Sequence, residues 1–191
     1  MLILPRSCFL HVPKTGGSWV KQAILAAGIP AREHSRNGDT HLGLADCPDD
    51  CSFRFAFVRN PLGLYRSYWQ FKQTVGWDPE NELDRKCRAD DFTRFVTKVL
   101  LAFPGVYARS LRDYVGPPET PIEFIGRFEN LVEDLVRALT LAGETFAADA
   151  IRGLPPSNVS DKQKAPAQFT PELEAAVRAA EAEVFERFGY T

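Results

Sequence analysis

The segment HVPKTGGSW, residues 11–19, constrains the fold of this chain more than any other stretch. A short apolar run from Cys8 to Leu10 precedes it, and a run typical of a helix, Val20 to Ala27, follows it. This order predicts a buried strand, a tight loop and the start of a helix. Such a layout is typical of a phosphate-binding loop.

The start of the helix explains why an anion would bind in this loop. The first amides of a helix have no partner within the helix, and they point, with the positive end of its dipole, at whatever precedes it. Gly16 and Gly17 allow a positive φ and a close approach to phosphate oxygens, while Lys14 adds a charge and Ser18 a hydroxyl donor. The alternative is an ordinary strand-to-helix turn in which Lys14 is solvated and Ser18 caps the helix.

Strands followed by helices recur along the chain. Residues 53–58 (FRFAFV) and 122–126 (IEFIG) are expected to be buried strands, and each precedes sequence with apolar residues on one helical face. We therefore expect an α/β fold, a three-layer P-loop-like arrangement with a central, mostly parallel sheet flanked by helices. We expect further helices at residues 90–103 and 106–115, either on the outside of the fold or as a lid. We expect a loop at residues 153–168.

Length and composition narrow the class of protein. A chain of 191 residues that is 45% hydrophobic predicts one domain, residues 1–191, with a well-buried core. A final helix from Pro171 to Phe188, with a start signal at Thr170, is expected to pack on that core. The net charge of -2 argues against general nucleic-acid binding.

The apolar stretches of the sequence indicate whether the chain crosses or is exported through a membrane. No stretch approaches the roughly twenty apolar residues of a membrane span. The apolar start of the chain is short and runs directly into the loop, so it does not resemble a signal peptide. We therefore expect a cytoplasmic protein without a membrane span.

Four cysteines in a chain of this length do not suggest a disulfide scaffold. Cys47 and Cys51, in the segment CPDDC, could pair or could supply two metal ligands. Two ligands do not make a zinc site, and no second cysteine or histidine pair follows at zinc-finger spacing. The sequence therefore predicts no bound metal.

A second group of polar residues follows the strand expected at residues 53–58. Arg59 comes directly after that strand, and Ser67 lies eight positions later on the next helix. Ligands of parallel α/β sheets collect beyond the carboxyl ends of the strands, so we expect Arg59 near the loop of residues 11–19. An arginine fork and a serine hydroxyl suit a second phosphate. The alternative is that Arg59 pairs with an acid and that Ser67 is a surface residue.

The pair of segments HVPKTGGSW and FVRNPLGLYRSYW resembles the cofactor-binding motifs of sulfotransferases that use PAPS, 3'-phosphoadenosine 5'-phosphosulfate. The first is similar to their 5'-phosphosulfate loop and the second to their 3'-phosphate motif. The segments IGRFENL, LPPSNVS and FTPELEAAVRAAEAEVFERFGY are similar to later parts of the same family, so the resemblance covers most of the chain. It implies transfer of a sulfuryl group to a hydroxyl or amine of a small-molecule or carbohydrate acceptor, with PAP as the product.

The resemblance also implies roles for individual residues. Lys14 would bind the bridging oxygen and the 5'-phosphate and stabilise the charge on the leaving PAP. Arg59 and Ser67 would bind the 3'-phosphate. Trp19 matches a position whose ring can stack on adenine, although a core tryptophan is an equal alternative. The residues expected to bind the cofactor are Pro13, Lys14, Thr15, Gly16, Gly17, Ser18, Trp19, Arg59 and Ser67.

Sulfuryl transfer needs in-line placement of donor and acceptor and a neutralised leaving group. It also needs a base that takes the proton of the acceptor hydroxyl. In this family the base is a histidine or a glutamate. His41 is the first candidate, His34 the second and Glu33 the third. His11, within the loop motif, is expected to pack or to face the phosphate.

Two other functions fit parts of the sequence. An ATP-dependent small-molecule kinase would usually carry GxxxxGK[ST], and here Lys14 precedes the glycines, which weighs against that function. A non-catalytic module that binds PAP or another nucleotide would keep the phosphate sites and lack the base. The chain is short for the family, and the sequence does not indicate the acceptor.

Overall fold

A computed structural model describes residues 1–36, 38–156 and 166–191. The described residues form two compact units, unit 1 (residues 1–36, 38–59 and 111–156) and unit 2 (residues 60–110 and 166–191). The single domain over residues 1–191 stays a prediction. Much of the loop expected at residues 153–168, including most of LPPSNVS, lies outside the described residues.

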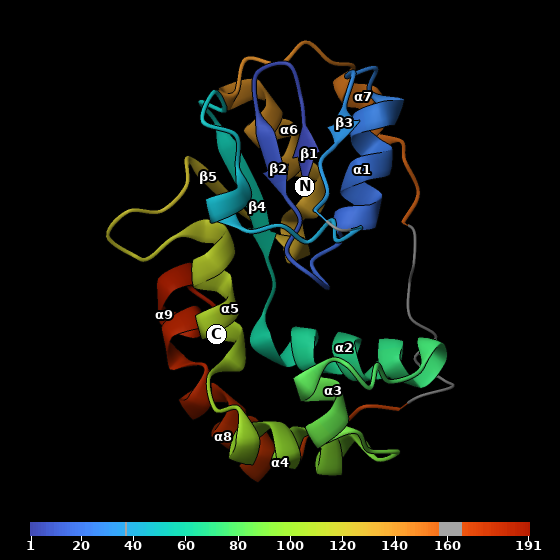
Figure 1. The fold of residues 1–191 in the computed structure, drawn as a ribbon, viewed down its shortest axis with the longest axis vertical. Coiled ribbons are helices and arrows are strands. Elements are labelled where there is room, and N and C mark those ends of the chain that lie inside the picture. The colour runs from blue at the N-terminus through green and yellow to red at the C-terminus, as the bar shows by residue number, and fades with distance from the viewer. Residues whose placement is uncertain (37, 157–165) are drawn as a thin grey trace. The chain divides into compact units, whose positions relative to one another are not determined.

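Unit 1 is an α/β unit whose described residues form a five-stranded sheet in the order β3-β1-β2-β4-β5 (Figure 1). Its central pairs, β2 with β4 and β4 with β5, are parallel, whereas β1 is antiparallel to both β2 and β3. The sheet is therefore mixed and not mostly parallel as expected. The strands are β1 (Leu2–Ile3), β2 (Cys8–Leu10), β3 (Arg32–Glu33), β4 (Arg54–Val58) and β5 (Phe124–Arg127).

The two strands that make the sheet mixed were not predicted from the sequence. Both β1 and β3 are two residues long, too short to show an alternating hydrophobic pattern. A turn closed by a hydrogen bond from the Leu4 amide to the Ser7 carbonyl folds β1 back onto β2. Strand β2 follows this turn and leads into the loop of residues 11–19. On its other side β2 pairs with β4, in the parallel part of the sheet.

Three helices of unit 1 pack against one face of the sheet: α1 (Gly17–Ala26), α6 (Leu131–Leu141) and α7 (Ala148–Arg152). Short 3-10 turns, η1 (Leu44–Asp46) and η2 (Phe128–Asn130), connect other elements. The core between helices and sheet includes Phe9, Phe55, Phe57, Val20, Ile24, Leu135, Leu139 and Ile151.

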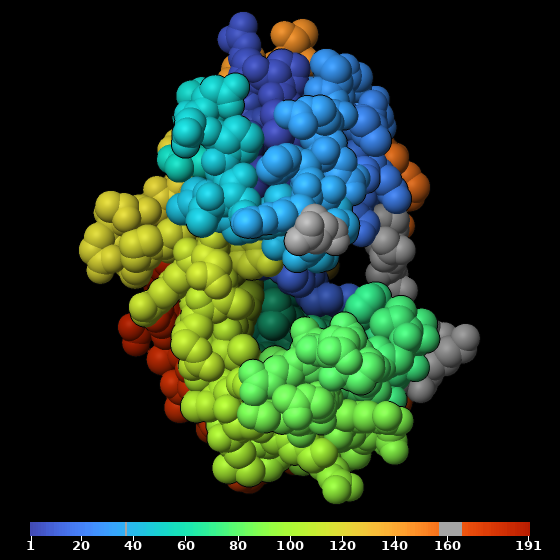
Figure 2. Space-filling view, viewed as in Figure 1, coloured from blue at the N-terminus to red at the C-terminus, as the bar shows by residue number. Residues whose placement is uncertain are grey.

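The opposite face of the sheet is also buried. Side chains alternate along a strand, so Cys8, Leu10, Ala56 and Val58 point away from the helices, and all four are buried. In the space-filling view the segment between β3 and β4 forms much of the front surface of unit 1 (Figure 2). Cys51, near the end of that segment, is bonded to Cys8 of β2.

Unit 2 is helical and has a core of its own. Its described helices are α2 (Pro61–Val75), α3 (Glu82–Cys87), α4 (Phe92–Ala102), α8 (Pro171–Ala180) and α9 (Ala182–Phe188), together with the first half of α5 (Val106–Val115), which the unit boundary crosses. Tyr65, Trp69, Phe92, Phe95 and Val177 are among the residues of this core. None of the helices formed by described residues is long and apolar enough to cross a membrane.

The helix expected from Pro171 to Phe188 is interrupted at Glu181 and forms α8 and α9. Its start is as expected, because the Thr170 hydroxyl accepts a hydrogen bond from the Leu173 amide at 3.2 Å. The interruption was not predicted, since apolar residues continue at helical spacing across it. At the interruption Glu181 is fully buried, and its carboxylate binds the amino end of α5.

Candidate functional site

The loop between β2 and α1 has a left-handed backbone at Lys14, with φ 65°, and at Gly16, with φ 86°. Thr15 lies between them and is buried, and its Oγ1 donates to the Val12 carbonyl oxygen at 2.8 Å. A lysine in this conformation is uncommon and often marks a functional constraint. Left-handed residues within a turn direct successive amides toward one point, an arrangement that binds anions. The positive φ considered at Gly16 is therefore confirmed, whereas Gly17 starts the helix and Lys14 has the second left-handed backbone; the binding of a phosphate by this loop stays a prediction.

The two glycines of the loop leave no room for a side chain. A Cβ atom on Gly16 would lie 2.6 Å from Cδ2 of Leu131, and one on Gly17 would overlap the ring of His11. Gly17 is the first residue of α1, and Ser18 is exposed in the first turn of that helix. The loop is thus packed closely on its inner side while its helix start reaches the surface.

Arg59 lies against this loop, as expected from its position after β4. Its Nη1 donates to the Lys14 carbonyl oxygen at 3.1 Å, and its Cζ lies 4.0 Å from the centroid of the Phe128 ring. The Phe128 ring also flanks Gly16, because a Cβ atom there would come within 3.2 Å of it. One aromatic ring therefore supports both the guanidinium and the loop.

Phe128 was not among the residues predicted to take part in the site. Two facts could have pointed to it: it follows β5, the parallel neighbour of β4, and it belongs to the segment IGRFENL. Residues after adjacent parallel strands meet at the same edge of the sheet.

Two of the residues predicted to bind the cofactor are buried. Trp19 belongs to the core of unit 1, is 6% exposed and donates from Nε1 to the Pro155 carbonyl oxygen at 3.1 Å. Trp19 is therefore a core tryptophan, the alternative to stacking on adenine, and little of its ring is accessible to a ligand. Ser67 is buried on α2 of unit 2, and its sharing of a phosphate with Arg59 stays a prediction. Pro13 is half-buried within the loop itself.

His41 is held beside the loop. Its Nδ1 lies 3.0 Å from the His11 carbonyl oxygen, and the two histidine rings are 4.4 Å apart. A carbonyl oxygen only accepts, so Nδ1 carries the hydrogen and the lone pair of the neutral ring is on Nε2. The Asp39 carboxylate accepts from the His41 amide at 2.8 Å, and the Tyr114 hydroxyl donates to the His41 carbonyl at 3.1 Å. His41 therefore presents a basic nitrogen in a fixed position.

The other candidate bases are less well placed. Burial lowers the pKa of His11 to about 3, and the nearby His41 acts in the same direction, so His11 is neutral and packs on Phe9. The hydrogen bond from Lys21 lowers the pKa of Glu33, which makes this carboxylate a weaker base. The backbone amide of His34 donates to the Met1 carbonyl at 3.1 Å, which pairs this residue with the start of the chain.

A cavity of about 340 Å³ adjoins the loop within unit 1. Lys21 and Glu33 bring charge to it, and the first turn of α1 supplies the Ser18 hydroxyl. Its volume is within the range of about 300 to 1,000 Å³ that is usual for small-molecule sites. The residues around it include Leu2, Phe9, His11, Ser18, Lys21 and Glu33.

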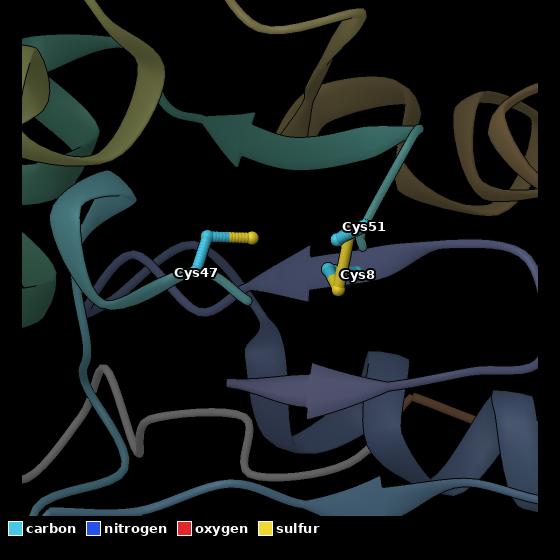
Figure 3. Close-up of side chains that lie close together, drawn as sticks. All are labelled: Cys8, Cys47 and Cys51. Carbon is cyan, nitrogen blue, oxygen red and sulfur yellow. A yellow bond between two sulfur atoms is a disulfide. The ribbon is translucent and has the colours of Figure 1, made fainter. Parts of the chain in front are cut away.

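The sequence left open whether Cys47 pairs with Cys51, and the structure gives Cys51 a different partner. Cys51 forms a disulfide with Cys8 and not with Cys47, and the Cα atoms of Cys8 and Cys51 are 6.3 Å apart, in the range of roughly 4.4 to 6.8 Å that suits a disulfide. The sequence did not indicate this partner, because Cys8 is 43 residues away and is brought close by the pairing of β2 with β4. Cys47 lies beside the pair (Figure 3).

Comparisons of the chain with models of protein families, with curated proteins and with solved structures found no match. The function is therefore inferred from the arrangement of the site.

Proposed function

We propose that the protein is a PAPS-dependent sulfotransferase, which moves a sulfuryl group to a hydroxyl or amine of a small-molecule or carbohydrate acceptor and releases PAP. The observation that carries this proposal is the hydrogen bond from Arg59 to the Lys14 carbonyl. Arg59 and the loop of residues 11–19, which follow two adjacent parallel strands, are in contact through this bond. A ligand with two separated phosphate groups needs such a pair of cationic sites. We also propose that the α/β unit has the three-layer P-loop-like architecture of this family.

The loop would hold the 5'-phosphosulfate. Amides at the start of α1 and the exposed Ser18 hydroxyl suit the phosphate oxygens. Because the Thr15 hydroxyl donates to Val12, Thr15 would contribute through its amide. The Lys14 ammonium would stabilise the negative charge that grows on the leaving phosphate.

Arg59 would bind the 3'-phosphate, which distinguishes PAP from ADP. A guanidinium has five N–H donors, so it can hold the Lys14 carbonyl and bind phosphate at the same time. The contact with the Phe128 ring fixes the plane of the fork, which favours bidentate binding.

PAPS would supply the sulfuryl group, and His41 would supply the base. The hydrogen bond from Nδ1 to the His11 carbonyl orients the ring and leaves Nε2 to take the proton of the acceptor. The charge that His41 then carries lies next to a carbonyl oxygen that stabilises it. The cavity beside His11 and Ser18 has room for a small polar acceptor.

Transfer of labelled sulfuryl from PAPS to a panel of alcohols, phenols, sugars and amines tests this proposal. We expect wild type to turn over at least one class, and His41→Ala to lower kcat by about 100-fold or more with unchanged PAP affinity. His34→Ala should stay close to wild type. If His41→Ala retains turnover, or if His34→Ala has the larger effect, the assignment of the base is wrong.

The same assay separates the alternatives. Turnover of ATP with no turnover of PAPS would favour a kinase. Binding of PAP with no transfer to any acceptor would favour a non-catalytic module.

A further inference from the structure

Three cysteine sulfurs converge in unit 1 on the face of the sheet opposite the helices. Cys8 begins β2, Cys47 follows η1 and Cys51 precedes β4, so the three side chains come from different local elements (Figure 3). Their Sγ atoms all lie within 4.8 Å of one another. Cys8 is buried, and Cys47 and Cys51 are half-buried.

A disulfide uses only two of these sulfurs and does not explain why the Cys47 sulfur lies beside them. A metal ion would use all three. In thiolate sites the metal–sulfur distance is about 2.3 Å, which places the sulfurs about 4 Å apart in tetrahedral or trigonal geometry. The sulfur positions seen here are compatible with that spacing once the bond between Cys8 and Cys51 is opened.

We propose that Cys8, Cys47 and Cys51, when reduced, bind one thiophilic closed-shell ion, Zn²⁺ or Cu⁺. Soft thiolate ligands select these ions over hard cations. Among the described residues no further cysteine, histidine or carboxylate joins the group. Zn²⁺ would therefore take a water molecule as its fourth ligand, whereas Cu⁺ can be three-coordinate with the three sulfurs alone.

A reductant supplies two electrons and is itself oxidised, two thiols to their disulfide or a phosphine, with the oxygen of one water, to its phosphine oxide. The Cys8–Cys51 disulfide takes up these two electrons and the two protons that the thiols or the water release, and becomes two thiols. Binding of the ion then releases one proton from each of the three thiols as the metal–sulfur bonds form. The disulfide and the ion exclude each other. The ion would tie the segment that runs from His41 to β4 onto strand β2.

The test uses the full chain, reduced with a phosphine under anaerobic conditions and titrated with Zn²⁺ or Cu⁺ against a chromogenic chelator. Co²⁺ serves as an optical probe, because thiolate ligands give it a charge-transfer absorption. We expect one ion per chain for wild type and for Cys87→Ser, which removes the buried cysteine of α3 in unit 2. We expect Cys47→Ser to bind at least about tenfold more weakly. The relative affinities of Zn²⁺ and Cu⁺ identify the preferred ion.

Alkylation followed by mass spectrometry gives a readout that does not depend on the folding of the Cys47 variant. In reduced Cys87→Ser, the ion should protect three thiols that react after a chelator is added. Binding by Cys47→Ser as tight as wild type, absence of thiolate charge transfer, or failure of the ion to protect Cys47 would each overturn the proposal.

Discussion

The carboxylate of Glu181 is the buried group whose replacement should most clearly destabilise unit 2. Glu181 is 0% exposed and, among the described residues, accepts hydrogen bonds from the Tyr65 hydroxyl at 2.8 Å, the Tyr107 amide at 3.2 Å and the Ala108 amide at 2.9 Å. Glu181→Gln keeps the shape and replaces one acceptor oxygen with an NH2 group. One buried amide of α5 then faces a donor.

The expected cost follows from that loss. An unsatisfied buried donor costs about 1 to 3 kcal/mol. We therefore expect Glu181→Gln to lower the free energy of unfolding by about 1 to 3 kcal/mol, a measurable part of the roughly 5 to 15 kcal/mol typical of a folded domain. Urea unfolding followed by circular dichroism measures it.

The effect should also depend on pH. Burial raises the pKa of Glu181 in the folded state, so its stabilising contribution is fully present below the unfolded pKa of about 4.3 and is lost as pH rises through the raised pKa. The difference between wild type and Glu181→Gln should therefore be larger in acid than at neutral pH.

Glu186→Gln is the matched control, because Glu186 is exposed on α9 and its change should stay within about 0.5 kcal/mol. A Glu181→Gln variant as stable as this control at every pH would refute the reasoning.

Two further predictions concern the loop and one ion pair. Gly16→Ala should lower both stability and PAP affinity, because it adds roughly 1 kcal/mol of left-handed strain and an overlap with Leu131. Gly28→Ala is the control: its φ is 79° and the space around it is open, so it should add the strain alone. Equal losses of stability for the two variants in thermal melts would contradict this. Hydrogen bonds from Arg54 lower the pKa of Glu123 to about 2, so their stabilisation is present above the unfolded pKa of about 4.3 and is lost as pH falls toward 2. Urea unfolding of Glu123→Gln should show a smaller loss over this range, and identical pH profiles would be inconsistent with the pair.

Hydrophobic periodicity was sufficient to predict the main elements of the fold. It predicted β4 and β5 and the helices that follow them, and the three-residue strand β2 was predicted because an apolar run precedes the loop motif and its helix. It missed β1 and β3, because two-residue strands have no period, and it missed the interruption at Glu181, because the apolar spacing continues across it.

The candidate site was predictable where its chemistry is local or follows a topological rule. The loop from Lys14 to Ser18 is a continuous motif, and the closeness of Arg59 followed from the meeting of strand ends at one edge of the sheet. Phe128 and Cys8 were not found, since their roles depend on which strands pair and in what register. A tryptophan at the start of a helix has the same sequence signature whether it faces a ligand or the core, as Trp19 illustrates.

Thermal unfolding with PAP or ADP at equal concentration is the most direct test of the paired phosphate sites. A ligand at about a hundredfold excess over its Kd stabilises the folded state by roughly 2.7 kcal/mol. The control variant is Arg137→Ala, since Arg137 is exposed on α6 and lies over the Phe124 ring, 5.9 Å from its centroid. We predict that PAP stabilises wild type and Arg137→Ala more than ADP does, and that Arg59→Ala loses this difference. Equal stabilisation of wild type by both nucleotides, no stabilisation by PAP, or an Arg59→Ala variant that still prefers PAP would contradict the proposed function.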